Sequence, residues 1–95
     1  MKRYVIERDI PGLGTSSLEE LSAAATETNN SIKETGNRVQ WEHSYIVDDK
    51  SYCIYLAESI QALEAHAKVA GFPANKIMEV KSILDPTKDI KISYK

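Results

Sequence analysis

The stretch VQWEHSYIVDDKSYCIYLAES, residues 39–59, decides the fold because it predicts two β-strands joined by a tight turn. Residues 38–47 and 51–57 are rich in β-branched and aromatic side chains, which favour strands, and two aspartates between them are typical of a turn. The stretch also holds the single tryptophan, the single cysteine and three of the five tyrosines. Most side chains suited to chemistry or recognition therefore lie in one hairpin.

The segments before the hairpin predict a strand and then a helix. Residues 2–8 have strand character and are followed by the turn signal Pro11 and Gly12. In residues 16–36, Ser17 and Glu20 have the spacing of a capping box, and a glycine ends the segment. The expected buried face of this helix, spaced by three and four residues, consists of Leu18, Leu21, Ala25, Thr28 and Ile32.

The segments after the hairpin repeat this order in reverse. Ser59 is the expected N-cap of a second helix and Gly71 its C-terminal cap, and residues 76–84 predict a last strand. The expected buried stripe of the helix is Ile60, Leu63, Ala67 and Ala70. The order β-α-β-β-α-β over residues 1–95 predicts one α+β domain of the ferredoxin-like type. Its antiparallel sheet should carry both helices on one face.

The hairpin also predicts a second copy of the chain. Strict alternation would place Val39, Trp41, His43, Tyr45 and Val47 on one face, and in the next strand Cys53 and Tyr55 opposite Tyr52, Ile54 and Leu56. Neither strand has a wholly polar face, and two helices cover only one side of the sheet. A partner chain would cover the other side, so we expect a homodimer of the dimeric α/β-barrel type.

The C-terminal segment, residues 88–95, predicts an extension of the sheet. Ile90, Ile92 and Tyr94 alternate with polar residues, as in a fifth strand. We expect this strand to be exchanged with the edge of the partner's sheet. Its deletion should then weaken the dimer and leave the fold of each chain intact.

Composition excludes several classes of protein. The chain of 95 residues is 42% hydrophobic and 27% charged with a net charge of −2, so no basic surface predicts binding to nucleic acid or to an anionic membrane. No apolar run is long enough to span a bilayer, and a single cysteine excludes an intrachain disulfide. Without a recognisable export signal, a reduced cytoplasmic protein is the expectation.

Three stretches carry a resemblance to a known family: YVIERDIPG at 4–12, the hairpin at 39–59, and HAKVAGFPANKI at 66–77. The chain resembles, over roughly residues 3–86, a family of short ferredoxin-like proteins of unknown function, some of them labelled nickel-binding. This resemblance implies a ferredoxin-like fold, a homodimer and binding of nickel or another divalent metal. It carries no proven catalytic role. We expect no organic cofactor.

His43 is the principal candidate metal ligand. Imidazole combined with carboxylates and water suits nickel or zinc, and Glu7 or Glu79 can join His43 if the register brings them to its face. Adjacent Glu42 is expected to point to the opposite face. The alternative ligands are Asp48 and Asp49 in the turn and His66, which is expected on the flank of the second helix. A structural interpretation of His43, as a hydrogen-bonded residue of the dimer core, also stands.

The remaining hairpin residues predict a lining for a ligand. Cys53 in a central strand is expected to act as a small hydrophobe, although His43 or a lysine beside it would make it a nucleophile. The candidate ligand-lining residues are Glu7, Trp41, His43, Tyr45, Cys53 and Tyr55. Three functions stay open: metal binding or sequestration, a cofactor-free enzyme or small-molecule binder that uses His43 in an aromatic cleft, and a structural module. The first is favoured, and a catalytic role is the less expected outcome.

Overall fold

The computed structural model of the protein describes residues 1–89. Four strands and two α-helices form the domain, and two short 3₁₀ helices accompany them. In chain order these are β1 (Lys2–Asp9), the 3₁₀ turn Leu13–Thr15, α1 (Leu18–Glu34), β2 (Val39–Ile46), β3 (Lys50–Ala57), α2 (Ile60–Ala70), β4 (Lys76–Glu79) and the 3₁₀ turn Pro86–Lys88.

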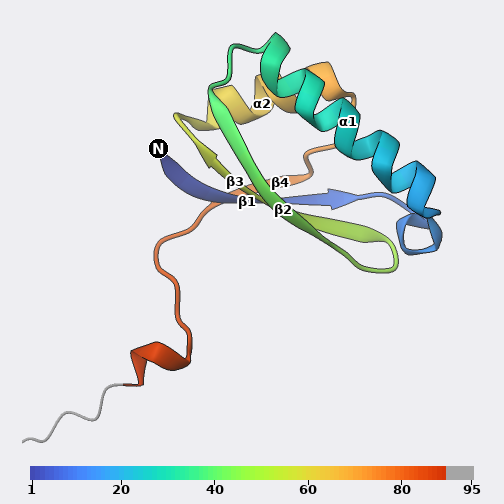
Figure 1. Cartoon of the computed structure of the whole chain (residues 1–95). Helices are drawn as coiled ribbons and strands as arrows, with labels where there is room; N and C mark the ends of the chain where they lie inside the picture. The colour runs from blue at the N-terminus through green and yellow to red at the C-terminus, as the bar shows by residue number, and fades with distance from the viewer. Residues whose placement is uncertain (90–95) are drawn as a thin grey trace, which may run out of the picture.

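The four strands form one antiparallel sheet in the order β2-β3-β1-β4. Strands β1 and β3 therefore lie in the middle, and both helices cover the same face of the sheet (Figure 1). This arrangement confirms the ferredoxin-like α+β fold. None of the helices within residues 1–89 combines the length and the apolar character that a membrane span requires.

The helix ends follow the sequence signals. Ser17 Oγ accepts from the backbone N–H of Glu20 at 3.1 Å, and Glu20 Oε1 accepts from the N–H of Ser17 at 2.8 Å. Ser59 Oγ likewise caps α2 by accepting from the N–H of Ala62 at 3.1 Å. Gly71 ends α2 with φ of 77°, a left-handed conformation that glycine adopts without strain. The predicted caps are confirmed.

The buried faces of both helices match the prediction in part. In α1 the predicted Thr28 is buried, but Leu18 is 83% exposed at the start of the helix and Ser31 is buried instead. In α2 the predicted Leu63 and Ala67 are buried together with Ala62 and His66, while Ile60 is 41% exposed. Hydrogen bonds that link α1, α2 and β3 require the polar Ser31 and His66 to face inward. A stripe predicted from apolar residues alone could not include these two positions.

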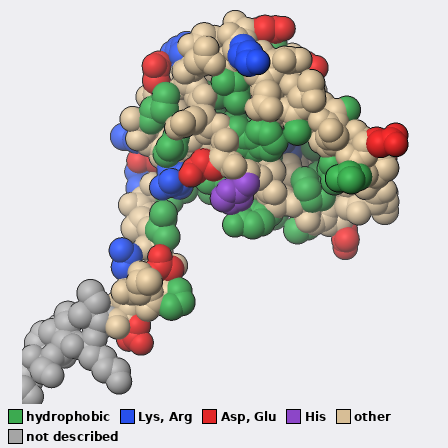
Figure 2. All heavy atoms as spheres, viewed as in Figure 1, with side chains coloured by type: hydrophobic (Ala, Val, Ile, Leu, Met, Phe, Trp, Pro, Cys, Tyr) green, Lys and Arg blue, Asp and Glu red, His purple; other side chains and the backbone are tan. Residues whose placement is uncertain are grey.

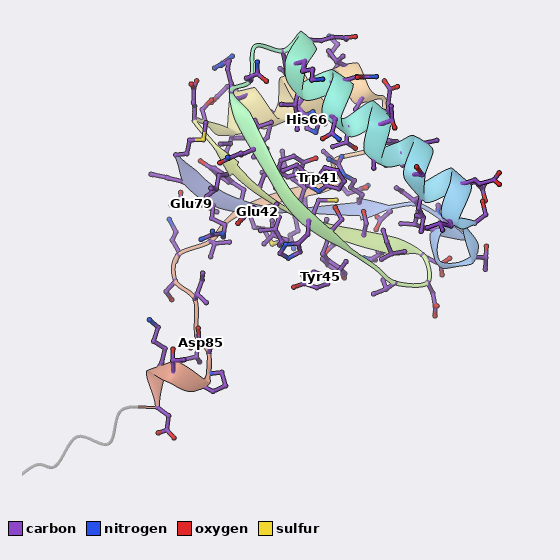
Figure 3. All side chains as sticks on the ribbon, in the orientation of Figure 1. Trp41, Glu42, Tyr45, His66, Glu79 and Asp85 are labelled. Atoms are coloured by element: carbon purple, nitrogen blue, oxygen red, sulfur yellow. The ribbon has the colours of Figure 1, made fainter. Side chains whose placement is uncertain are left out.

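A β-bulge divides strand β2 into two parts with opposite orientation. Trp41 lies opposite Tyr55 in β3, His43 lies opposite Ile54, and Glu42 between them is the extra residue. Trp41 therefore points toward the helices, whereas His43 and Tyr45 point to the other side of the sheet. Figure 3 shows Trp41 beneath the helices and Tyr45 on the opposite side. The prediction that these three side chains share one face was wrong because alternation is broken by one residue.

The core lies between the sheet and the helices. Its residues, all of them buried, are Tyr4, Ile6, Val39, Cys53, Tyr55, Ala57, Ala62 and Leu63. Cys53 is 6% exposed within this cluster, as a small hydrophobe would be.

The face of the sheet opposite the helices, which we call the open face, is half apolar. The register places on it Val5, Tyr45, Tyr52, Ile54, Leu56 and Met78. Tyr45 is 59% exposed, and the other five are only partly buried. Within residues 1–89 no helix covers this face, so its apolar side chains are accessible to a partner.

Strand β4 is shorter than predicted. It pairs with β1 over residues 76–79, and the backbone N–H of Val80 adds one more hydrogen bond to Arg3 O at 2.8 Å. The chain then leaves the domain (Figure 1), and Leu84 is 88% exposed. The fifth strand was predicted over residues 88–95; Lys88 lies in the 3₁₀ turn Pro86–Lys88, and residues 90–95 lie outside the described part of the chain.

Candidate functional site

A cavity of about 640 Å³ lies between α1, the sheet and the loop that follows α2. Its walls are mostly apolar, and Figure 2 shows hydrophobic side chains around a hollow on this side of the molecule. The hairpin contributes Trp41, Cys53 and Tyr55 to the lining, and β1 contributes Arg8. This volume lies within the range of small-molecule sites, and an apolar lining with few polar groups is typical of them.

Arg8 is the single charged side chain with nearly complete burial among the described residues, at 2% exposure. Its Nη1 donates to Pro73 O at 2.7 Å, and its guanidinium lies over the Phe72 ring, 5.8 Å from the centroid. The Nη2 atom is buried and has no hydrogen-bond partner within residues 1–89. No carboxylate of that part of the chain lies within salt-bridge distance of Arg8. The cavity therefore contains a cation without a counter-ion.

Sequence reasoning missed Arg8, although a signal was present. Alternation in β1 places Arg8 on the same face as Tyr4 and Ile6, both of which are buried beneath the helices. The loop after α2 then encloses the arginine, and Asn75 fastens that loop to β1 by accepting from the N–H of Asp9 at 2.7 Å. An arginine at an inward position of a central strand is thus the pattern that points to this site.

A chain of buried hydrogen bonds lies behind the cavity. Tyr55 OH is 2.7 Å from His66 Nε2, and Ser31 Oγ is 2.9 Å from His66 Nδ1. Ser31 Oγ also donates its only proton to His66 O at 2.7 Å. His66 Nδ1 must then carry a proton and donate to Ser31, which leaves Nε2 to accept from Tyr55. Hydrogen-bond counting thus fixes the neutral tautomer of His66.

Burial keeps the side chains of His66 and Tyr55 uncharged at neutral pH. Desolvation, together with the smaller effect of the positive charge of Arg8, lowers the pKa of His66 to about 4. Desolvation raises the pKa of Tyr55 to about 12, against an opposing effect of Arg8. His66 was expected at the flank of its helix, but it is completely buried and inaccessible as a metal ligand.

The open face carries the second set of candidates, centred on His43. The His43 ring meets the Tyr45 ring edge-on, with centroids 4.9 Å apart. Glu42 also reaches this face because of the bulge, and it forms a bidentate ion pair with Arg3. Arg3 Nε donates to Glu42 Oε1 at 2.8 Å, and Arg3 Nη2 donates to Glu42 Oε2 at 3.2 Å. The hydrogen bond from Arg3 lowers the pKa of Glu42. The prediction that Glu42 and His43 point to opposite faces was wrong.

Glu7 lies on the open face but not beside His43. Glu7 lies in β1, opposite Tyr52 of β3, whereas His43 lies in β2. Because β3 lies between these two strands, their backbones are separated across the sheet by two inter-strand spacings, about 10 Å. Lys50 Nζ contacts Glu7 at 3.0 Å and Asp9 at 3.3 Å. The hydrogen bond to Glu7 is the first cause of the raised pKa of Lys50. Glu7 is thus already engaged by a cation.

The other acidic candidates lie elsewhere. Glu79 faces the helix side, opposite Tyr4. Asp48 and Asp49 are exposed in the hairpin turn, where Asp49 accepts from the N–H of Gly12 at 2.8 Å. Across residues 1–89 no three side chains among His, Cys, Asp and Glu converge on one point. The described residues of one chain therefore do not complete a metal site.

The six candidate ligand-lining residues are divided between the two faces of the sheet. Trp41, Cys53 and Tyr55 line the cavity, whereas Glu7, His43 and Tyr45 lie on the open face.

Comparisons with known proteins match this fold. The crystal structure of SCO4226 from Streptomyces coelicolor A3(2) superposes with a TM-score of 0.73 at 19% identity, over 86% of this chain and 99% of that one. No curated protein sequence matches significantly. The family model described as "Nickel responsive protein SCO4226-like" matches residues 4–80. The chain therefore belongs to the SCO4226-like family of nickel responsive proteins.

Proposed function

We propose that the protein is a homodimer that binds a divalent transition metal, with nickel as the candidate, and that His43 supplies the imidazole ligand. The bulge at Glu42 is the observation that carries this proposal. It turns His43 out of the helix-covered core and onto the one face of the sheet that no described helix covers. The family description as nickel responsive supports the choice of metal.

The composition of the open face supports the dimer. Six partly or largely accessible apolar and aromatic side chains share it, and such a patch favours association with another surface. A second copy is the simplest partner because a two-fold axis makes one patch complementary to itself. The same two-fold axis places each metal-coordinating side chain near it opposite the same side chain of the second copy.

A symmetric site also explains why one chain alone offers too few ligands. The carboxylates nearest to His43 on its own face are engaged, Glu42 by Arg3 and Glu7 by Lys50. Two copies would supply two imidazoles, and water or a released carboxylate would complete the shell of a nickel ion. In this proposal the metal lies between two chains and serves sequestration rather than catalysis.

The alternative function, an enzyme that uses His43 as a general base, is less well supported. His43 lies on the opposite face of the sheet from the cavity that Trp41, Cys53 and Tyr55 line, so it cannot act on a molecule bound there. His66 lies behind Tyr55 and has an accepting nitrogen already bonded to that hydroxyl. A metal-binding role therefore accounts for His43 better than base catalysis in an aromatic cleft does.

The dimer is tested by its mass in solution. Light scattering at micromolar concentration should give about twice the 10.6 kDa of one chain. Ile54→Glu should shift the mass toward the monomer, because it places a charge within the apolar patch, while Asp48→Asn in the exposed turn should leave the dimer unchanged. A wild-type protein that stays monomeric under these conditions contradicts the proposal.

Nickel binding is tested by calorimetric titration of the wild type and of His43→Ala. We expect one ion per dimer and at least a hundredfold loss of affinity in His43→Ala, since this change removes both imidazoles of a symmetric site. Asp48→Asn should bind nickel within twofold of the wild type. Full binding by His43→Ala, together with a loss in Asp48→Asn, would place the ion at the hairpin turn instead.

A further inference from the structure

We infer that the cavity beneath α1 binds a small apolar monocarboxylate, with Arg8 as the partner of its carboxylate. This site lies on the helix side of the sheet, and the proposed metal site lies on the open face. The two inferences therefore rest on different residues and can fail separately.

The charge of Arg8 identifies the chemistry of the ligand. A buried cation is costly unless an anion lies beside it, because desolvation is compensated only by pairing and hydrogen bonding. The acidic residues on either side of Arg8 in sequence, Glu7 and Asp9, lie on the open face, where they contact Lys50 at 3.0 and 3.3 Å. Arg8 Nη2 is left as a buried donor that a ligand carboxylate oxygen can satisfy.

The guanidinium is held in place for such a ligand before it binds. Nη1 donates to Pro73 O at 2.7 Å, and the guanidinium carbon lies over the Phe72 ring, 5.8 Å from its centroid. An arginine fixed in this way loses little conformational freedom on binding, and preorganisation of this kind raises affinity. The loop that fixes Arg8 also forms one wall of the cavity.

The rest of the cavity requires an apolar body. Leu21 and Ala25 of α1, Ile46 of β2 and Phe72 of the loop provide apolar walls, and Trp41 adds an aromatic one. The polar groups near the cavity are mostly satisfied within the protein: Ser44 Oγ accepts from Trp41 Nε1 at 3.0 Å, and Tyr55 OH is bonded to His66. A sugar or another neutral polar molecule would therefore find few free partners, whereas an alkyl or aryl acid needs only Arg8.

The test compares an acid with its matched neutral alcohol. Wild-type protein is titrated with octanoate and with 1-octanol at pH 7.5 by calorimetry, and octanoate should bind at least tenfold more tightly because only the acid pairs with Arg8. Arg8→Gln should remove this preference and leave octanol affinity within about twofold. Ala25→Phe should weaken both ligands, since it fills the cavity. His43→Ala, on the open face, should bind octanoate as the wild type does.

Two results would overturn the inference. Octanoate that shows no binding up to millimolar concentration, or that binds no better than octanol, excludes Arg8 as a carboxylate partner. The same conclusion follows if a folded Arg8→Gln variant keeps the full preference for the acid. The comparison of the two ligands on the wild type decides the matter even if Arg8→Gln fails to fold.

Discussion

His66→Ala is expected to lose about 3–5 kcal/mol of unfolding free energy, which is a large part of the stability of a domain of this size. The His66 side chain is completely buried and bonds to Tyr55 in β3 and Ser31 in α1. Its removal leaves a cavity between the helices and the sheet, and it deprives the buried Tyr55 hydroxyl of its acceptor, while Ser31 Oγ keeps only its bond to the backbone O of residue 66. Urea denaturation followed by circular dichroism measures the loss.

His43→Ala provides the matched control, since it removes the same side chain from an exposed position. Its unfolding free energy should change by no more than about 0.5 kcal/mol in the monomeric Ile54→Glu background, where the dimer makes no contribution. Equal effects of the two substitutions would show that the hydrogen-bonded chain from Ser31 to Tyr55 does not stabilise the fold.

Acid is expected to destabilise the protein through the same histidine. The pKa of His66 is about 4 in the folded chain against an ordinary value of 6.5, so between these values the unfolded chain binds the extra proton. Stability is therefore complete above pH 6.5 and falls as the pH drops toward 4, by about 2–4 kcal/mol in all. The cause is burial, reinforced by the nearby charge of Arg8.

The slope of stability against pH measures this effect. Unfolding free energies at pH 7, 6, 5 and 4 should fall steeply for the wild type and much less for His66→Gln, which cannot titrate. Carboxylates with lowered pKa values, such as Glu20 and Glu42, titrate in both proteins and cancel in the comparison. Identical slopes for the two proteins would mean that His66 binds its proton as readily in the folded chain as in the unfolded one, so that burial does not lower its pKa.

Much of the fold was predictable because its signals are local. The capping box at Ser17, the cap at Ser59 and the glycine at 71 define helix ends by hydrogen bonds within a few residues. The hairpin defines two strands by composition and turn residues. The right-handed crossover rule then leaves one arrangement of sheet and helices, which the structure confirms.

The placement of the candidate residues was less predictable because it depends on contacts distant in sequence. The bulge at Glu42 leaves no mark in hydrophobic alternation, and it places Trp41 and His43 on opposite faces of the sheet. His66 looked peripheral because a stripe of alanines and a leucine was easier to recognise than a polar pair between helices. Arg8 was overlooked because an isolated charge in a strand usually lies in solvent, whereas here the loop at Phe72 and Pro73 packs over it.

The central claim is that the bulge places the metal-binding His43 on the open face, away from the cavity on the helix side, and paramagnetic broadening by Ni²⁺ tests it most directly. In amide correlation spectra of the labelled wild-type protein, added nickel should broaden the signals of Glu42, His43 and Tyr45 first. Signals from the cavity side, such as those of Ala25 and Phe72, should persist at the same nickel concentration. Broadening that begins at Asp48 and Asp49, or around the cavity, would contradict the account.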